Sequence, residues 1–530
     1  MLSSDSFRAR QLGDARGALA KGLILLVLAG CAGSRVASDD ESAVPPTPRE
    51  FRAAWVASVA NIDWPSQPAL SSTEQQSELL AILDRAVALN LNAIILQIRP
   101  AGDALYVSAY EPWSEYLTGH QGAPPFPFYD PLEFAVEEAH RRGLELHAWF
   151  NPFRARHATA ESPAHPKHVS RTNAEIVLDY GDQQWIDPGV PRAREYVLEV
   201  MLDVVRRYDL DGIHIDDYFY PYEITDSLGA PVPFPDTLSF AAVLDDSTFT
   251  MPTDSTERAL ADWRRSNVDA FVEQLYARVK QAKPHIKVGI SPFGIWRPGH
   301  PPQIEGFDAY DRIYADARKW LREGWVDYFT PQLYWSIDGP AQSYPVLLEW
   351  WSNENVLGRH IWPGNFTSRV IAENQTVWEP AEILRQIDVT RGTAAGSGNV
   401  HFSMKAIMPH ATGMGRALAA GPYDGPAIVP DTPWLNGAAP SRPQLAWDDL
   451  ADRNRLLIRP GGLGSPRLWV VKVLGQDGWE VRVVPAWHRA VDVGDGGQTP
   501  RKVVVTAVDR LGAESESAEL GPRVGYATSR

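Results

Sequence analysis

The sequence has 530 residues, of which 44% are hydrophobic and 22% are charged, proportions that are ordinary for a globular protein. Its formal net charge of −16 makes nucleic acids and anionic membrane surfaces poor direct partners. The length predicts more than one domain, although a barrel of alternating strands and helices with insertions can occupy most of such a chain.

The first residues have the features of an export signal. Four basic side chains precede the apolar run "GLILLVLAG", which ends at Cys31. Because this run is too short to cross a bilayer, we interpret it as the apolar core of a signal peptide, residues 1–30. "LAGC" resembles the lipobox of bacterial lipoproteins, which implies acylation of Cys31 (palmitate is a typical chain) and a membrane contact through the lipid alone. The alternative is a buried cysteine beside a chance apolar run.

Ala32 follows Cys31, so the aspartate that retains lipoproteins in the inner membrane is absent. By resemblance, this favours an outer-membrane lipoprotein that faces the periplasm. The stretch "SRVASDDESAVPPTPRE" contains prolines and few apolar residues, which is typical of a flexible tether. We therefore assign residues 31–50 to a tether. The exported part has no second cysteine and can form no internal disulfide.

From residue 51 a short apolar strand, a loop and an amphipathic helix alternate repeatedly. The predicted strands are 51–59, 92–100, 144–152, 212–221, 287–294, 326–335, 360–366 and 399–407. Eight such strands favour an α/β fold of the (β/α)8 type, a TIM-like barrel that we assign to residues 51–420. A doubly wound open sheet is the alternative, but no Gly-rich turn follows the first strand.

Two helices show clear start signals and apolar stripes. In "RAREYVLEVMLDVVRRY" the side chains of Val197, Val200, Met201, Val204 and Tyr208 share one face, and Pro191 suits a first-turn position. "TEQQSELLAILDRAVAL" opens with a capping-box pattern from Thr73 to Gln76.

The last part of the chain is strand-rich and lacks helical periodicity. "GAAPSRPQ" lies at the end of a predicted linker, residues 421–442, and residues 443–525 show β alternation around glycine-containing turns. "RKVVVTAVDRLGAES" resembles the closing strands of a fibronectin type III-like sandwich. We expect a small β-sandwich accessory domain, and the sequence leaves open whether it is a spacer or a binding module.

Polar and aromatic residues gather where the predicted barrel strands end. Examples are Asn151-Pro152, Ser291-Pro292 and Gln332 to Trp335. In a parallel barrel these ends open onto one face, where barrel enzymes have their active sites. The pattern therefore predicts a site at this face.

Two adjacent carboxylates, Asp216 and Asp217, end the strand "GIHIDDYFYP". His214, Asp216 and Tyr218 share a parity opposite to Ile213 and Ile215, so they are expected to face the barrel axis. Asp217 reaches the same pocket only if the backbone turns there. The alternative is that one aspartate caps a turn while the other pairs with an arginine such as Arg99 or Arg297.

Two carboxylates in a mouth lined by tryptophan and tyrosine suit the cleavage of a glycosidic bond. Sugar rings stack on aromatic faces, and their hydroxyls bind polar side chains. Cleavage needs one carboxylic acid and one carboxylate that acts as nucleophile or base. Adjacent carboxylates repel, which raises the pKa of one of them. The sequence does not assign the acid.

Residues 51 to about 415 resemble the glycosyl hydrolase-like ten family of bacterial lipoproteins. The resemblance rests on long motifs that occur in order, among them "WVASVANIDWP", "LQIRPAGDALY", "EPWSEYLTG", "YDPLEFAVEEAHRRGLELHAWFNPFR", "DGIHIDDYFYP" and "YADARKWLREGWVDYFTPQLYW". It implies a glycosidase that cleaves peptidoglycan glycan strands freed of their stem peptides, and Asp216 and Asp217 match the paired aspartates of the family.

A comparison with chitinase-like barrels limits the catalytic mechanism that the strand from Asp211 can support. Their D-x-x-D-x-D-x-E strand, aligned from Asp211, places Asp216 at the inner aspartate and Tyr218 where the acidic glutamate belongs. The chitinase mechanism therefore does not transfer directly. If the substrate's N-acetyl group is the nucleophile, this frame makes Asp217 or a carboxylate from another loop the proton donor.

Further candidates for substrate binding lie near the strand ends. They are Trp55, Asp63, Trp64, Arg99, His147, Asn151, Asp187, Tyr218, Gln332, Tyr334 and Trp335. Arg99 suits a sugar carboxylate such as the lactyl group of muramic acid, or else it pairs with Asp216. His147 is equally a core histidine, Asp187 equally a helix N-cap, and Asp63 and Trp64 equally loop packing.

No metal site or cofactor is predicted. His157, His165 and His168 are irregularly spaced and are expected in a solvated loop. Two alternatives to a peptidoglycan hydrolase stay open: an inactive glycan-binding envelope lipoprotein, and a glycosidase for another N-acetylhexosamine polysaccharide. The oligomeric state is unknown from the sequence.

Overall fold

The computed structural model describes residues 43–244, 256–371, 377–409, 413–435, 437–451, 453–462, 464–494 and 499–523. The predicted signal peptide, the lipidation site Cys31 and the tether up to residue 42 lie outside these residues. From Val44 onward the chain forms one compact unit. None of the helices in the described ranges combines the length and apolar character needed to span a bilayer.

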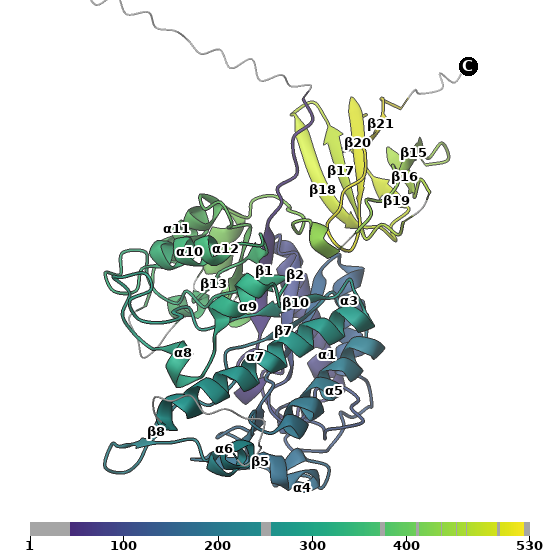
Figure 1. Ribbon diagram of the computed structural model, residues 1–530. Helices are drawn as coiled ribbons and strands as arrows, with labels where there is room; N and C mark the ends of the chain where they lie inside the picture. The colour runs from purple at the N-terminus through teal and green to yellow at the C-terminus, as the bar shows by residue number, and fades with distance from the viewer. Residues whose placement is uncertain are drawn as a thin grey trace, which may run out of the picture. The chain divides into compact units, whose positions relative to one another are not determined.

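A sheet of parallel strands forms the centre of the fold (Figure 1). The strand order is β12-β11-β10-β7-β3-β2-β1-β14-β13. The strands are β1 Phe51–Val56, β2 Ala93–Arg99, β3 Glu145–Phe150, β7 Gly212–Ile215, β10 Lys287–Ile290, β11 Tyr328–Phe329, β12 His360–Ile361, β13 Gly364–Asn365 and β14 Gly398–His401. Each predicted barrel strand is present at its predicted place, although all are shorter than predicted and 360–366 is divided into two.

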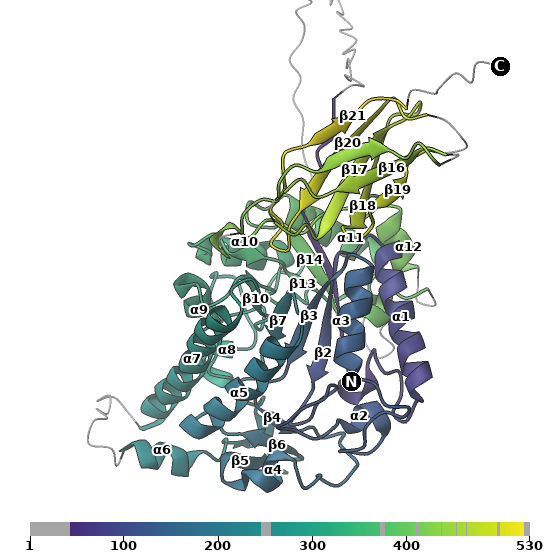
Figure 2. The same ribbon diagram turned by 90° about the vertical axis from the view of Figure 1, so that its right-hand side faces the viewer.

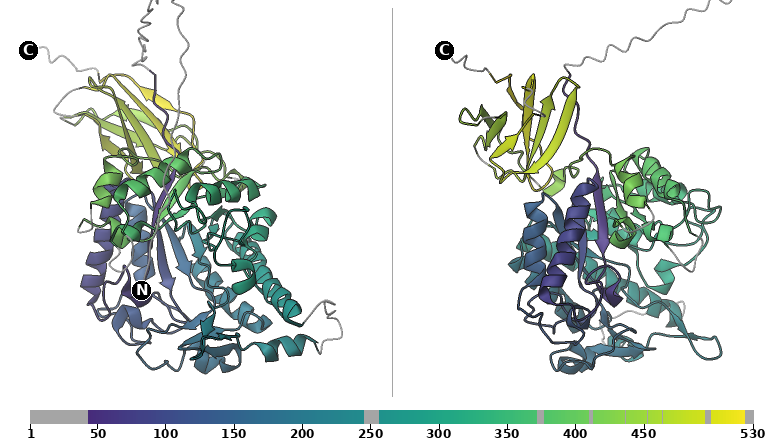
Figure 3. Two further views of the ribbon diagram at one scale, coloured as in Figure 1. Left: turned by 90° about the vertical axis from the view of Figure 1, so that its left-hand side faces the viewer. Right: turned by 180° about the vertical axis from the view of Figure 1, so that it is seen from behind.

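The two ends of this sheet meet in one segment. Strands β12 and β13 are consecutive pieces of residues 360–365, interrupted at Trp362 and Pro363. On one side Trp362 N donates to Phe329 O at 2.9 Å, and on the other Val400 N donates to Pro363 O at 3.0 Å. In Figure 3 the purple β1 lies beside the green β14, with which it pairs in parallel. The predicted (β/α)8 barrel is thus confirmed, and the open doubly wound sheet is excluded.

Helices follow the strands and cover the outside of the barrel, as Figure 2 shows for α1, α3, α5 and α7. They are α1 Ser72–Ala88, α3 Pro131–Arg141, α5 Pro191–Arg207, α7 Thr256–Ala282, α9 Ala317–Glu323, α10 Tyr344–Glu354, α11 Pro380–Arg391 and α12 Met414–Ala419. Pro191 occupies the first turn of α5, as predicted. The predicted capping box of α1 was wrong by two residues, because Ser71 and Glu74 form it.

Several short elements interrupt the strand–helix alternation. A three-stranded sheet of β4 (Arg154–Arg156), β5 (Val177–Tyr180) and β6 (Gln183–Ile186) follows β3, and the hairpin β8 (Ile224–Thr225) and β9 (Pro231–Val232) follows β7. The remaining short helices are α2 Glu115–Thr118, α4 Val169–Thr172, α6 Thr237–Leu244, α8 Ala309–Arg312, η1 Val59–Asn61, η2 Ala174–Ile176, η3 Thr367–Ile371, η4 Met404–Ile407 and η5 Pro433–Leu435.

Alternation along the strands divides the apolar residues between two cores. On β1, Ala54 and Val56 belong to the large core under the helices, whereas Phe51, Ala53 and Trp55 belong to a second core inside the barrel. This second core is rich in aromatic rings, and Phe51 stacks on Trp362 with ring centroids 3.8 Å apart. The barrel interior is therefore a packed core, and its tryptophan side chains are Trp55, Trp149 and Trp362.

Glycine makes room for one of these large interior rings. A Cβ atom at Gly289 on β10 would lie 1.9 Å from Cζ of Tyr328 on the neighbouring β11. Any other residue at position 289 would displace Tyr328, whose hydroxyl bonds to two histidines of the barrel interior.

The chain after the barrel forms two antiparallel sheets, which fit the predicted small β domain. Their orders are β15-β16-β19 and β18-β17-β20-β21. The strands are β15 Gln444–Trp447, β16 Arg455–Arg459, β17 Leu468–Leu474, β18 Trp479–Pro485, β19 Ala490–Asp492, β20 Lys502–Val508 and β21 Ala518–Leu520. The predicted linker contains buried Tyr423 and Ile428, and Trp434 Nε1 donates to Asp327 Oδ1 at 2.9 Å.

Asp211, just before β7, is bound by arginines of this β domain. Its carboxylate accepts hydrogen bonds from Arg467 at 3.2 Å and from Arg510 at 3.2 Å, and it contacts His140 at 2.9 Å. Burial alone would raise the pKa of Asp211, but these cationic partners hold it well below the usual range. The strand that leads to Asp216 is therefore fixed at its start by a buried ionic cluster.

Asp211→Ala should lower the free energy of unfolding by about 3–5 kcal/mol, because the substitution leaves Arg467 without a counter-ion in a buried site, while Arg510 keeps only its pair with Asp209 at 2.7 Å. Urea denaturation followed by tryptophan fluorescence measures the change. Asp338→Ala is the matched control: Asp338 is 79% exposed in its pair with Arg385, so its loss should cost less than about 1 kcal/mol. Equal effects for both variants would contradict a stabilising role of the cluster.

Candidate active site

A pocket of about 330 Å³ lies at the carboxyl ends of the barrel strands. Residues from or just after β1, β2, β3, β7, β10, β11 and β14 contribute to it. Its lining is Trp55, Ala57, Val59, Ala60, Ile62, Gln97, Trp149, Arg154, His157, Asp216, Asp217, Tyr218, Tyr222, Ser291, Gln332, Tyr334 and Phe402. The predicted face of the barrel thus contains a pocket, and the aspartate pair is in it.

Asp216 and Asp217 reach the pocket together because β7 ends at Ile215. Ile213 and Ile215 lie in the core under the helices, and His214 faces the barrel interior, as the alternation predicted. The predicted strand 212–221 was too long: the backbone leaves the sheet at Asp216, and this turn lets two consecutive side chains share one pocket.

Asp216 has one oxygen bound and one oxygen without a partner. Its Oδ2 accepts hydrogen bonds from Trp149 Nε1 at 3.0 Å and from Asn151 Nδ2 at 3.4 Å. Its Oδ1 is buried and makes no hydrogen bond with the described residues. Burial raises the pKa of Asp216 to about 7, and the charge of Asp217 adds to this effect, while Arg154 opposes it. Near neutral pH this carboxyl group holds a proton for a large part of the time.

Asp217 has both oxygens occupied by donors. Gln332 Nε2 donates to Oδ1 at 3.0 Å, and the hydroxyl of Tyr222 donates to Oδ2. Burial raises the pKa of Asp217 above its usual value, and these two hydrogen bonds offset part of that rise because they favour the anion. The two neighbouring carboxyl groups therefore have different environments: Asp216 favours the acid form and Asp217 the carboxylate.

Aromatic rings form the walls and floor around the two carboxyl groups. Trp55 and Trp149 come from the barrel interior, and Tyr334 stacks on Phe366 with centroids 5.0 Å apart. Tyr218 and Tyr222 meet edge to face at 5.5 Å. Such ring faces bind the apolar C–H faces of sugar rings. The pocket therefore combines an acid, a carboxylate and planar apolar surfaces.

Of the sequence-predicted site residues, Trp55, Tyr218, Gln332 and Tyr334 line the pocket. Asn151 is fully buried and lies behind it, where its amide contacts Asp216 as described above. The structure thus places these five residues with the aspartate pair. The other candidates lie elsewhere.

His147 lies in a hydrogen-bonded chain along the barrel interior and does not line the pocket. The indole of Trp55 donates to His214 Nε2 at 3.1 Å, and because an indole N–H only donates, His214 carries its proton on Nδ1. Tyr328 OH lies 3.0 Å from this Nδ1 and 2.8 Å from Nδ1 of His147. His147 Nε2 then donates to Glu145 at 3.0 Å. His147 is a core histidine.

Arg99 is also buried away from the pocket. Both of its predicted roles, binding a sugar carboxylate and pairing with Asp216, were therefore wrong. Its guanidinium forms two hydrogen bonds with Glu111, at 2.8 and 2.5 Å, and donates to the backbone oxygens of Asn151 and Pro152. It is 0% exposed. With its charge neutralised by Glu111, Arg99 holds the loops after β2 and β3 in place and pairs with no active-site aspartate.

Asp187 lies outside the pocket as well. Its carboxylate accepts hydrogen bonds from Gly189 N at 2.8 Å and from Ser239 Oγ at 2.5 Å. The N-cap residue of α5 is Val190, so Asp187 stabilises the turn before that helix instead of capping it.

Asp63, Trp64 and Trp335 do not line the pocket. Asp63 accepts hydrogen bonds from Ala57 N, Ser403 Oγ and Lys405 N, and it lines a neighbouring cavity of about 280 Å³. Trp64 is fully buried and donates to Gln75 O at 2.9 Å, which is a packing role. Trp335 meets Phe293 edge to face at 5.7 Å.

Trp149, Arg154, His157, Tyr222, Ser291 and Phe402 line the pocket but were not predicted as site residues. Trp149 shares its strand parity with His147 and Asn151, so the alternation of β3 was a signal for it. Tyr222 belongs to a loop and Arg154 to the short strand β4, and no periodicity in the sequence indicates the course of either segment. His157 was expected in a solvated loop; instead, burial lowers its pKa to about 4 and keeps it neutral.

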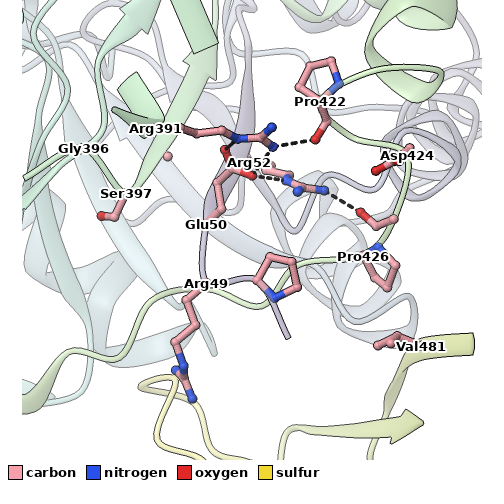
Figure 4. A pocket seen from close by; sticks show the side chains of 13 residues that line it. Arg49, Glu50, Arg52, Arg391, Gly396, Ser397, Pro422, Asp424, Pro426 and Val481 are labelled. Carbon is pink, nitrogen blue, oxygen red and sulfur yellow. Dashed lines mark hydrogen bonds and ion pairs between the residues drawn. The ribbon is translucent and has the colours of Figure 1, made fainter. Parts of the chain in front are cut away.

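No cluster of histidine, cysteine, aspartate and glutamate side chains suited to a metal ion occurs within the described ranges. A second cavity, of about 500 Å³, lies at the amino ends of β1 and β14 (Figure 4). Its Arg52 and Arg391 both bind Glu50, and they donate further to the backbone oxygens of Gly425 and Pro422. Because Arg52, Arg391 and Glu50 bind one another, this cavity does not offer a pair of carboxyl groups like that of Asp216 and Asp217.

Asp216→Asn should make the protein more stable at alkaline pH. The folded pKa of about 7 lies above the unfolded value of 3.8, so wild-type stability falls as the pH rises from about 4 to 7. The uncharged amide avoids this loss of stability, which is at most about 4 kcal/mol because the pKa is raised by about three. Thermal unfolding should therefore show a higher Tm for the variant at pH 8 and nearly equal Tm values at pH 4. Asp182→Asn is the control for the same substitution at an exposed position, and an Asp216→Asn variant less stable than wild type at pH 8 would refute the argument.

Comparison with known proteins places the chain in a family. The family model "Glycosyl hydrolase-like 10" matches residues 50–379. Glycosyl hydrolase YngK of Bacillus subtilis is 39% identical over 89% of this chain and 93% of its own length. Glycosyl hydrolase DigH of Escherichia coli K12 is 34% identical over 57% of this chain and 70% of its own length. Among solved structures, the PgaB glycoside hydrolase domain from Bordetella bronchiseptica is 15% identical, with a TM-score of 0.44 over 70% of this chain and 98% of that domain. The chain belongs to the glycosyl hydrolase-like 10 family and is a glycoside hydrolase.

Proposed function

We propose that this glycoside hydrolase cleaves the glycan strands of peptidoglycan, and that it prefers strands freed of their stem peptides. The observation that carries the catalytic part is the placement of Asp216 and Asp217 in one aromatic-walled pocket with different hydrogen-bond environments. The choice of peptidoglycan rests on the long motifs shared with the family.

In this proposal Asp216 is the general acid. Its pKa of about 7 leaves a proton available at neutral pH, and Oδ1 is the oxygen with no protein partner. Trp149 and Asn151 both bind Oδ2, so the proton resides on Oδ1 and is donated from there to the leaving glycosidic oxygen.

Asp217 supplies the anionic carboxylate. Tyr222 and Gln332 fix both of its oxygens and stabilise its charge. Its negative charge faces the positive charge that develops on the sugar ring as the bond to the leaving oxygen breaks. A water molecule completes the hydrolysis by adding its hydroxyl to that ring carbon, and its remaining proton returns to Asp216. This division of roles differs from the one that the chitinase-like frame gave, in which Asp217 or another carboxylate was the donor.

The N-terminal features extend the proposal to the location of the enzyme. Export by the predicted signal peptide and acylation of Cys31 would attach it to the outer membrane facing the periplasm, where peptidoglycan lies. The predicted tether would then separate the barrel from the membrane.

Asp216→Asn and Asp217→Asn should each lower kcat/KM on denuded glycan strands by about 10²–10⁴-fold, the usual contribution of a general acid or base. The assay follows new reducing ends and identifies the products by mass spectrometry. In wild-type protein the activity should fall as the pH rises through about 7, because Asp216 loses its proton. The Asp217→Asn variant should show this alkaline decline at lower pH, since the neighbouring charge that raises the pKa of Asp216 is gone.

Asp187→Asn provides the matched control, because Asp187 is a buried aspartate outside the pocket, and it should retain at least a tenth of the activity. Full activity in both site variants would refute the catalytic assignment. Glycan binding by wild-type protein without new reducing ends at any pH would instead favour the inactive binding lipoprotein. If the protein cleaved only an uncharged N-acetylhexosamine polymer, that polymer would replace peptidoglycan as the proposed substrate.

Cys31→Ser should release the protein from the membrane fraction when it is expressed in a bacterium with a lipoprotein pathway. Loss of the thiol removes the acylation site, and one apolar run without lipid does not give stable anchoring. Metabolic labelling with palmitate and fractionation of cell envelopes measure the outcome. Ala32→Ser leaves the thiol in place and should remain labelled; a labelled Cys31→Ser protein would refute the lipidation site.

A further inference from the structure

Arg154 stands apart from the other buried arginines of the described chain. Arg52, Arg99, Arg264 and Arg265 each form an ion pair with a carboxylate. Arg154, at the start of β4, is 4% exposed, yet no carboxylate among the described residues pairs with it. A buried, unpaired guanidinium destabilises a fold unless something compensates its charge.

The donors of Arg154 are largely unused. Nη1 makes a long hydrogen bond of 3.4 Å to Pro100 O, and Nε is buried without any partner. The guanidinium carbon lies 4.4 Å from the ring centre of Tyr218 and 5.8 Å from that of Trp185. These aromatic faces hold the plane of the group, and the Tyr218 hydroxyl is a further polar neighbour. Nε is enclosed, so the terminal Nη end of the guanidinium is the part that can meet an acceptor.

Arg154 lines the same pocket as the aspartate pair. Its charge lowers the pKa of both Asp216 and Asp217 from a distance, without an ion pair. When Asp216 is protonated, the charges of Asp217 and Arg154 cancel, so the pocket carries no excess negative charge. An anionic group of a ligand can therefore enter here, although the protein as a whole carries a net charge of −16.

We infer that Arg154 binds a carboxylate on the substrate sugar, such as the lactyl carboxylate of the muramic acid residues in peptidoglycan. This inference rests on the proposed function and narrows it to glycans that contain an acidic sugar. A guanidinium matches a carboxylate with two parallel hydrogen bonds, which a neutral hydroxyl does not reproduce. Arg154 thus takes the role that the sequence had given to Arg99, and it distinguishes peptidoglycan from an uncharged N-acetylhexosamine polymer.

The first test changes the ligand and leaves Arg154 intact. Full-length Asp216→Asn protein, in which turnover is expected to be about 10²–10⁴-fold slower, is titrated calorimetrically with two probes. One is denuded glycan oligosaccharide, and the other is the same oligosaccharide with its lactyl carboxylates reduced to alcohols. Loss of hydrogen bonds to a charged group costs about ten- to a hundredfold in affinity, so the reduced probe should bind that much more weakly.

The second test changes Arg154 in the same background. Arg154→Ala should bring the affinity ratio of the two probes close to one, and Arg154→Lys should keep a preference of a few-fold because it retains charge but not the paired donors. Arg297→Ala is the matched control: Arg297 follows β10 at the same end of the barrel, but Asp308 and Asp311 pair with it, so the ratio should not change. The ratio of the two affinities does not change when a variant binds both probes more weakly to the same degree. If Arg154→Ala does not fold, Arg154→Lys provides the test.

Equal binding of the two probes, no binding of either, or an unchanged preference in a folded Arg154 variant would each overturn the inference. The proposed function fails by a different measurement, namely the absence of new reducing ends when wild-type protein is incubated with denuded glycan. Cleavage of both glycans at equal rates with equal binding would leave the hydrolase intact and remove the role of Arg154.

Discussion

The organisation of this site follows from the cost of placing two neighbouring carboxyl groups in one buried pocket. Both cannot be ionised there without strong repulsion and loss of hydration. The protein resolves this by giving them unequal partners: two donors bind the two oxygens of Asp217, whereas one oxygen of Asp216 has none. The barrel supports this inequality, because Trp149, Tyr222 and Gln332 come from the carboxyl ends of β3, β7 and β11, which lie in one continuous stretch of the sheet.

Much of the fold could be predicted from the sequence. Each barrel strand is a short apolar run followed by polar residues and often proline, and this pattern located all of the barrel strands. It also extended them too far, as at 212–221, because the residues after a barrel strand keep the composition of a strand while the backbone turns into the loop. The capping box of α1 was misplaced for a local reason, since Ser71 and Thr73 both have a hydroxyl that can cap a helix.

The site was less predictable, because long-range pairing decides which polar residues stay available. Arg99 and Arg154 both follow barrel strands, and nothing local separates them. Arg99 has Glu111 twelve residues further along the chain, and this carboxylate binds its donors, whereas Arg154 meets aromatic rings and one backbone oxygen but no carboxylate among the described residues. Tyr222 likewise depends on the course of the segment after β7. A sequence pattern shows which end of a strand is polar, but not which of those polar groups find partners in other loops.

The hydrogen-bonded chain inside the barrel has an electrostatic consequence for the pocket. From Trp55 through His214, Tyr328 and His147 to Glu145, every donor points the same way, and Lys287 binds the far end of Glu145 at 2.8 Å. The small dipoles add up instead of cancelling. Their positive ends point toward the amino side of the strands, so the barrel axis presents its negative pole under Trp55, on the side where the proposed reaction develops positive charge on the sugar ring.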